Sequence, residues 1–336
     1  AVAGNTVLAK PAEQTSIVAH RVIELLYEAG MPRDVVQLLP GDGPTVGSVL
    51  TSDPRITGVV FTGGTDTAQI INRALAAREG AALPTLIAET GGMNAMIVDS
   101  TALPEQVVAD VIQSAFQSAG QRCSALRVLY LQEDVADRVI TILEGAMNEL
   151  RVADPRDLGT DVGPVIDEDA RRGLGAHIER LKAEGRLVAE TRLDPRLTGD
   201  GTFVAPVAFE IDGIEALERE QFGPILHIVR YRASEIDRVI ESINGRGYGL
   251  TFGVHSRNES FADEIAQKIR VGNVYVNRNI IGAVVGVQPF GGQGLSGTGP
   301  KAGGPHYLLR FATEKTVTVN TAALGGNASL LALGDE

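Results

Sequence analysis

The sequence predicts an α/β protein built from two successive parallel-sheet units. Two observations predict this class. Short apolar runs of strand length alternate with amphipathic runs of helix length, at the spacing of βα units, over residues 6–88 and again over residues 94–276. Glycine pairs mark turns in this pattern, as at Gly63-Gly64 between a strand and a helix. Such alternation favours a mainly parallel sheet with helices on its faces in each unit.

The first unit contains four predicted strands and three predicted helices. Helix 13–29 has an apolar face at helical spacing, and it ends at Gly30 with Pro32 beyond. The pattern G-x-G-x-x-G is absent, so the standard dinucleotide fingerprint is missing. The predicted strands are 6–9, 35–39, 56–61 and 85–88, and the remaining predicted helices are 45–50 and 65–78.

The second unit begins near residues 89–92, where the alternation restarts. Residues 316–319 alternate with period two near the end of the chain, which predicts an exposed strand that pairs with another subunit. The predicted strands of this unit are 94–98, 127–131, 225–229, 250–254 and 274–276, and the predicted helices are 104–118, 135–150, 168–184, 234–244 and 261–269.

Length, composition and charge exclude several classes of protein. A chain of 336 residues is long enough for two domains, and 44% hydrophobic with 21% charged residues is ordinary for globular proteins. The net charge of −12, without a basic patch, argues against nucleic-acid binding. One cysteine excludes an intrachain disulfide and fits a reducing, cytoplasmic compartment. The longest apolar-plus-glycine run, 280–287, is too short to span a bilayer.

The only cysteine, Cys123, follows a predicted helix inside the Gly- and Arg-containing stretch 118–125. A thiolate is the reactive form of cysteine, and an adjacent cation or nearby backbone N–H groups would favour it, which makes Cys123 a candidate nucleophile. The alternative is that this lone cysteine is a small buried hydrophobic residue.

Four other stretches carry candidate functional groups, each with an ordinary alternative. Glu89 ends a strand that should be buried, without an obvious cationic neighbour, so its pKa should be raised and it could act as a general base, or it is an ordinary strand-end acid. Gly63-Gly64 suits a pyrophosphate at a helix N-terminus, or is a plain turn. Glu13, after Lys10-Pro11, could accept hydrogen bonds from ribose hydroxyls and would repel a 2′-phosphate, or is a first-turn acid. Glu220 and Phe222 by themselves indicate only a turn before a strand.

Taken in order, the stretches KPAE, FTGGT, ETGG, GQRCS and EQFGP resemble the aldehyde dehydrogenase superfamily over nearly the whole chain. The resemblance implies a partial Rossmann-type NAD domain, a catalytic α/β domain and a terminal bridging strand, at 1–89, 90–312 and 313–336. It further implies that Cys123 is the nucleophile and Glu89 the hydrolytic base. The implied cofactor contacts are Lys10 and Glu13 at the adenosine ribose, Gly63 and Gly64 at the pyrophosphate, and Glu220 and Phe222 at the nicotinamide.

Residues 281–292 are similar to the aldehyde-anchor loop of Δ1-pyrroline-5-carboxylate (L-glutamate γ-semialdehyde) dehydrogenases. That resemblance implies that Ser124 and the backbone N–H groups of Gly282 and Ala283 hold the substrate carboxylate, with Phe290 beside the substrate. A hydroxyl with paired backbone donors is a coherent small anion site. No metal site is implied.

Residues 296–305 and 321–334 resemble the dehydrogenase module of the bifunctional proline utilisation A family of bacteria. The resemblance implies an upstream FAD-dependent proline dehydrogenase part, a homodimer, and a parent protein that associates peripherally with the membrane. Because residues 1–5 contain no initiator methionine and resemble the end of a helix, we expect the chain to start inside a domain. The first strand of the cofactor sheet, most of the bridging domain and an upstream oxyanion-hole Asn would then lie outside it.

The sequence departs from the superfamily pattern at Thr90 and Met93, where Leu and Lys are usual, and at Gly64, where Ser is usual. None of these changes removes a reacting group. The resemblance implies NAD-dependent oxidation of L-glutamate γ-semialdehyde to L-glutamate through a thiohemiacetal and a thioester on Cys123, with impaired activity if the chain is isolated. The alternatives are another aldehyde dehydrogenase, including a CoA-acylating one, and a non-catalytic dimerisation or lid module of the same fold.

Overall fold

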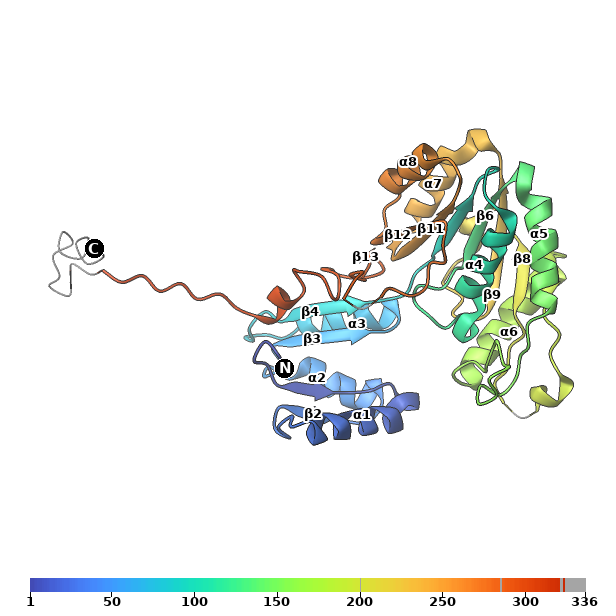
Figure 1. The fold of residues 1–336 in the computed structure, drawn as a ribbon. Coiled ribbons are helices and arrows are strands. Elements are labelled where there is room, and N and C mark those ends of the chain that lie inside the picture. The colour runs from blue at the N-terminus through green and yellow to red at the C-terminus, as the bar shows by residue number, and fades with distance from the viewer. Residues whose placement is uncertain (200, 285, 321–322, 324–336) are drawn as a thin grey trace.

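The computed structural model describes residues 1–199, 201–284, 286–320 and 323. Its N-terminal unit holds two pairs of parallel strands with three helices beside them, and its second unit holds a large sheet (Figure 1). In the N-terminal unit the strands are β1 (Val7–Ala9), β2 (Val36–Leu38), β3 (Gly58–Thr62) and β4 (Thr85–Glu89). The helices are α1 (Ser16–Glu28), α2 (Ser48–Ser52) and α3 (Thr65–Ala76), with a 3-10 turn at Glu13–Thr15 and a π-helical turn at Gly43–Gly47.

The parallel pairing of the first unit is confirmed, but its strands do not form one continuous sheet. β1 pairs with β2, and β3 pairs with β4, while no described strand joins β1 to β3. Apolar side chains on the faces of these strand pairs are uncovered: Leu8 is 41% exposed and Val60 57% exposed. A parallel sheet normally has both faces covered. The two pairs therefore contribute less buried apolar surface than a joined sheet would.

The second unit is organised around a seven-stranded sheet in the order β12-β11-β5-β6-β9-β8-β7. Neighbouring strands are parallel except for β7 and β8. The centre of this sheet is buried and apolar. Met96, Leu129 and Ile228 are in register on β5, β6 and β9, and all three are fully buried. The strands are β5 (Ala95–Val98), β6 (Val128–Gln132), β7 (Leu187–Glu190), β8 (Val207–Glu210), β9 (Ile225–Tyr231), β11 (Thr251–His255) and β12 (Asn273–Val276).

Five helices accompany this sheet. Among them, α4 and α5 pack against each other and against β9, and α8 packs against β11. The predicted helices of this unit are all present, with bounds shifted by a few residues. They are α4 (Pro104–Phe116), α5 (Glu133–Asn148), α6 (Glu168–Ala183), α7 (Ile236–Gly245) and α8 (Glu259–Lys268).

Strands β7 and β8 were not predicted from the sequence. β7 lies at the edge of the sheet with its side chains exposed or half-buried, so it lacks the apolar run that marks an inner strand. β8 is buried but only four residues long, and it follows a loop with no helix before it.

The chain returns from the second unit to the edge of the first. Residues 296–298 run beside β4, because Thr90 N–H donates to Ser296 O (3.0 Å) and Thr298 N–H donates to Ala88 O (3.0 Å). Just before them, β13 (Gln293–Gly294) pairs with β10 (Tyr248–Gly249) in the second unit. This returning segment joins the two units and covers the end of β4, where Glu89 lies.

Residues 313–320, which include the predicted strand 316–319, form no strand with any described residue and extend away from the body (Figure 1), so the pairing of this strand with another subunit stays a prediction. Val317 and Val319 are 72% and 61% exposed. The physical reason is that a lone strand has no partner for its backbone groups. The remainder of the predicted tail, apart from residue 323, lies outside the described residues. Within the described part of the chain, no helix combines the length and apolarity needed to cross a membrane.

We expect Leu143→Ala to lower the free energy of unfolding by about 2–5 kcal/mol, because it leaves a cavity in a well-packed core. Leu143 lies on α5 and is fully buried against the sheet. Leu158→Ala is the matched control, since the Leu158 side chain is fully exposed. Urea unfolding followed by circular dichroism measures both, and equal effects of the two changes would contradict this packing.

Candidate active site

The loop that carries Cys123 has an unusual backbone. Three consecutive residues have a left-handed backbone conformation: Ser118, Ala119 and Gly120, with φ of 56°, 53° and 64°. Such a conformation costs about 1–2 kcal/mol for each residue that carries a Cβ. A Cβ at Gly120 would stand 2.2 Å from the carbonyl oxygen of Gly223, so only glycine fits there. The loop is therefore pressed against the 220–223 turn and needs specific contacts to hold it.

Asn94 supplies some of these contacts. Its amide Nδ2 donates to the carbonyl oxygens of Cys123 (2.7 Å) and Ala125 (2.9 Å), while its Oδ1 accepts from Thr251 N–H (3.2 Å). The Asn94 side chain is buried, so these bonds are shielded from water. Asn94 thus fixes the backbone on both sides of Ser124.

Burial raises the pKa of the Cys123 thiol, and the negative charge of Glu220 raises it further. The backbone N–H groups of Ser124 and Cys123 lower the pKa of the thiol, as expected, but their effect is smaller than that of burial. The neighbouring cation does not help, because Arg122 Nε donates to Ser118 Oγ (3.2 Å) instead. In the protein without ligand, burial therefore outweighs the local donors, and the role of Cys123 as the nucleophile stays a prediction.

Glu89 lies at the end of β4, where the returning segment covers it. Both of its carboxylate oxygens are buried and have no hydrogen-bond partner among the described residues. Burial raises the pKa of Glu89 to about 7, and the nearby N–H of Gly292 offsets only part of this rise. The backbones of Gly291 and Gly297 pack so closely that a Cβ on either would lie 3.1–3.3 Å from the carboxylate. The expected rise in pKa is present, and the role of Glu89 as a base stays a prediction.

Glu220 lies over the glycines that follow Glu89. Gly92 N–H donates to Glu220 Oε2 (3.3 Å), and a Cβ at Gly91 would stand only 1.9 Å from that oxygen. Glu220 Oε1 accepts from Arg127 Nη2 at 2.9 Å. Burial raises the pKa of Glu220, and the Arg127 guanidinium offsets part of that rise. The Phe222 ring lies 5.1 Å from the Arg127 guanidinium carbon and remains 44% exposed.

In the N-terminal unit, the structure brings Lys10 and Glu13 together. Lys10 Nζ donates to Glu13 Oε1 (3.2 Å) and to Gly41 O (2.8 Å), and Gly43 N–H donates to the same Glu13 oxygen (3.0 Å). A hydrogen bond from its own backbone N–H, followed by the hydrogen bond from Lys10, lowers the pKa of Glu13. Glu13 is therefore held as a carboxylate beside the start of α1, with exposed oxygens that a hydroxyl can reach.

Gly63 and Gly64 form the turn between β3 and α3. Gly64 is the N-cap of α3, no side chain caps this helix, and a Cβ at Gly64 would meet nothing within 4 Å. The first N–H groups of α3 are thus free for an anion, and a serine would also fit at this position. Gly63 N–H donates to Glu89 O (3.2 Å), which links this turn to the end of β4.

The predicted carboxylate anchor lies around the end of α4. Ser114 accepts from Leu126 N–H through its carbonyl oxygen (3.0 Å) and from Ile280 N–H through its hydroxyl (3.1 Å). These bonds bring the segment after Ser124 and the start of the anchor loop to the same residue. Ser124 is buried, whereas Gly282 is exposed and has a φ of 91°. In the same loop lies Ala283, and Phe290 further along pairs its backbone with Ala302 at 3.0 and 2.8 Å.

Sequence reasoning missed Arg127 and Asn94. Arg127 is the largest of the fully buried side chains, and it stands directly before the apolar run of β6. A charge beside a buried strand needs a partner, which was the available signal. Nothing comparable marks Asn94, because its role depends on carbonyl groups about thirty residues later in the chain.

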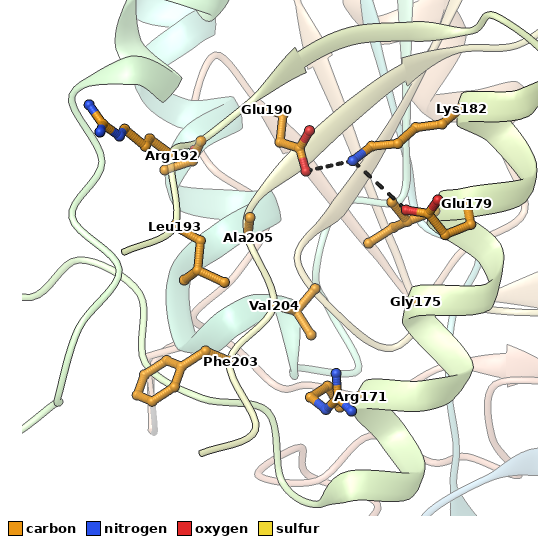
Figure 2. A pocket seen from close by; sticks show the side chains of 12 residues that line it. Arg171, Gly175, Glu179, Lys182, Glu190, Arg192, Leu193, Phe203, Val204 and Ala205 are labelled. Atoms are coloured by element: carbon orange, nitrogen blue, oxygen red, sulfur yellow. Dashed lines mark hydrogen bonds and ion pairs between the residues drawn. The ribbon is translucent and has the colours of Figure 1, made fainter. Parts of the chain in front are cut away.

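A separate hollow of about 390 Å³ lies between α6 and residues 190–205 (Figure 2). Its charged side chains are partly paired with each other, as Lys182 Nζ lies 2.8 Å from Glu190 Oε1. None of the predicted site residues lines it. The candidate active site is the cluster of Cys123, Glu89 and Glu220 at the junction of the two units.

A lone thiol and two largely buried carboxylates thus lie where the two parallel α/β units meet. The chain belongs to the aldehyde dehydrogenase family, whose model matches residues 1–317. It is 56% identical over 320 residues to the bifunctional protein PutA of Klebsiella aerogenes, covering 93% of this chain and 24% of that relative. The chain thus spans about a quarter of the length of that protein.

Two solved structures are similar in fold. A crystal structure of a Bradyrhizobium japonicum proline utilization A (PutA) mutant matches with a TM-score of 0.91 and 58% identity, covering 96% of this chain and 32% of that one. The 1-pyrroline-5-carboxylate dehydrogenase from Thermus with bound NAD matches with a TM-score of 0.86 and 38% identity, covering 92% and 59%.

We expect alkylation of Cys123 by iodoacetamide, without ligand, to rise with pH around a midpoint above that of an ordinary cysteine. Glu220→Gln should lower this midpoint because it removes a nearby negative charge. Glu218→Gln is the matched control, since Glu218 is exposed on the same segment. A midpoint at or below that of free cysteine would contradict the assigned environment.

Proposed function

We propose that this chain is a dehydrogenase module that oxidises L-glutamate γ-semialdehyde, formed from Δ1-pyrroline-5-carboxylate, to L-glutamate in proline catabolism, with NAD as the hydride acceptor. The observation that supports this most is the placement of the Cys123 thiol within the electrostatic reach of both Glu220 and Glu89. The names of the similar proteins, PutA and 1-pyrroline-5-carboxylate dehydrogenase, support the choice of substrate.

The residues present fit NAD. The uncapped first turn of α3 at Gly63 and Gly64 offers free N–H groups to a pyrophosphate. Lys10 and Glu13, which follow the end of β1, would contact the adenosine ribose, and the negative charge of Glu13 favours NAD over NADP. Glu220 and Phe222 would hold the nicotinamide ribose and ring. When bound, the nicotinamide supplies the hydride acceptor of the reaction.

Cys123 carries the substrate through the reaction. After the thiol loses its proton to water, the sulfur attacks the aldehyde carbon and forms a thiohemiacetal alkoxide, whose oxygen is stabilised by the Cys123 backbone N–H. Loss of hydride from that carbon leaves a thioester on Cys123. Glu89 then takes a proton from water, which attacks the thioester carbon and releases glutamate and the thiol.

The substrate carboxylate would bind at the anchor around the end of α4. Ser124 would donate its hydroxyl, and Gly282 and Ala283 their backbone N–H groups, with Phe290 packing beside the carbon chain. The tether of Ser114 to both Leu126 and Ile280 supports this arrangement, because it ties the two anchor segments to one residue.

We extend the proposal to the organisation of the whole protein. Residues 1–89 form part of the NAD domain, 90–312 the catalytic domain, and 313–336 a bridging strand and tail that pair with a second copy in a dimer. The exposed valines of 313–320 support this pairing. We also propose that an upstream proline dehydrogenase part with FAD belongs to the same protein, which works in the cytoplasm and binds peripherally to the membrane. The coverage of only 24% of the bifunctional protein PutA supports an upstream part.

We expect Cys123→Ala to abolish both NADH formation and turnover in the full-length protein. Glu89→Gln should keep the initial NADH burst but slow later turnover, because acylation survives while hydrolysis does not. Stopped-flow absorbance separates the two phases, and Glu79→Gln at an exposed site is the control.

The pH dependence gives a second readout of Glu89 in the same experiment. With its pKa raised to about 7, Glu89 is protonated below that pH and cannot accept a proton, so wild-type turnover should fall as pH drops through 7. This limb should vanish in Glu89→Gln. Loss of the burst as well would place Glu89 earlier in the reaction.

We expect Ser124→Ala to lower kcat/KM for L-glutamate γ-semialdehyde by about ten- to a hundredfold, since one hydrogen bond to a charged group is worth roughly 1.5–3 kcal/mol. Pentanal, which has a similar length but no carboxylate, is the control substrate and should be nearly unaffected. Equal losses with both aldehydes would remove Ser124 from the carboxylate site.

A further inference from the structure

Arg127 joins the Cys123 loop to the 220–223 turn through one buried guanidinium. Arg127 is fully buried, and all three nitrogens of its guanidinium donate hydrogen bonds. Nη1 donates to Gly120 O (2.7 Å), and Nη2 donates to Arg122 O (3.0 Å). These two acceptors flank the nucleophile loop on the side that precedes Cys123.

The same guanidinium also holds the opposite turn. Nη2 and Nε donate to Glu220 Oε1 at 2.9 and 3.3 Å, and Nη1 donates a longer bond to Gly223 O (3.4 Å). The fork of five N–H donors is what allows one side chain to reach two carbonyls of one segment and a carboxylate and a carbonyl of another. A lysine would offer one nitrogen in place of three.

The backbone of Arg127 is fixed as firmly as its side chain. Its N–H donates to Asn94 O (2.9 Å), and its carbonyl oxygen accepts from His227 N–H (3.0 Å). His227 Nδ1 lies 3.0 Å from the same carbonyl, which can only accept, so Nδ1 carries the proton and donates. The position of the guanidinium is therefore set from both ends of the residue.

A second histidine completes this support. Because His227 Nε2 is then an acceptor, His177 Nε2 at 2.9 Å must be the donor. The remaining His177 Nδ1 accepts from Arg180 Nη2 (3.4 Å). Burial lowers the pKa of His177 to about 4 and that of His227 to about 3, so both rings are neutral and this direction of donation persists at neutral pH.

We infer that Arg127 is a positioning residue that sets the placement of the Cys123 sulfur relative to the nicotinamide held at Glu220 and Phe222. The inference rests on the proposed function. The left-handed residues before Cys123 explain why such a device is needed, since the loop does not keep this conformation by local preference. Arg127 touches no reacting atom; it acts through Gly120, Arg122 and Glu220.

This role predicts a selective defect. In Arg127→Lys, the single-turnover rate of NADH formation at saturating NAD and aldehyde should fall by about ten- to a hundredfold, because bonds to a charged group are lost. Acylation of Cys123 by p-nitrophenyl acetate without NAD needs the thiol but not the 220–223 turn. The rate of this acylation should therefore change by less than about threefold. Arg230→Lys is the matched control, because Arg230 also pairs with carboxylates, at Glu210 and Asp137.

Two results would overturn the inference: equal loss of both rates, which indicates general support of the loop, or no loss of either. If Arg127→Lys does not fold, the double variant Arg127→Gln/Glu220→Gln is the substitute, because it leaves no unpaired buried charge. Its rate of NADH formation should fall selectively when it is compared with Glu220→Gln alone. Failure of the proposed function is distinguishable, because the wild-type protein would then form no NADH from L-glutamate γ-semialdehyde, or Cys123→Ala would keep that turnover. If Cys123→Ala is inactive and Arg127→Lys lowers both rates alike, only the inference on Arg127 fails.

Discussion

The ion pair between Arg127 and Glu220 joins the parts of the candidate site that come from different regions of the sequence. Arg127 stands directly before β6, the strand after the nucleophile, and Glu220 lies in the turn before β9. Glu220 also reaches back to the glycines that follow Glu89. Burying two charges is unfavourable unless each remains fully hydrogen-bonded. The carbonyls of the Cys123 loop and the Gly92 N–H supply those bonds, so the geometry of the loop and the solvation of the ion pair depend on each other.

The position of Glu89 depends on a different constraint, the return of residues 296–298 to the edge of β4. This segment excludes water from the carboxylate without offering it a hydrogen bond, and the resulting rise in pKa is mainly a burial effect. The site therefore contains two acids in contrasting surroundings. Glu220 has a cationic partner and several donors, whereas Glu89 has neither, and only such a difference allows neighbouring carboxylates to take separate roles.

The sequence predicted the alternation of strands and helices well because periodicity is a local property. Helices α4 to α8 and the inner strands follow from runs of apolar residues. The stretches around Glu89, Cys123 and Glu220 were found as motifs, but their mutual contacts were not, since these join residues far apart in the chain. Asn94, His177 and His227 were missed for the same reason. The direction in which the pKa of Cys123 shifts could not be predicted from the sequence, because burial and the Glu220 charge depend on the folded surroundings.

The fit of Gly91 beneath the Glu220 carboxylate has a consequence for evolution. A methyl group at position 91 and an acid at position 220 in this orientation would occupy the same space. Any lineage that acquires a side chain at position 91 must therefore shorten, reorient or replace the acid at position 220. Across an alignment of relatives, the two positions should show correlated substitutions, whereas Gly64, with open space around it, should vary without any compensating change elsewhere.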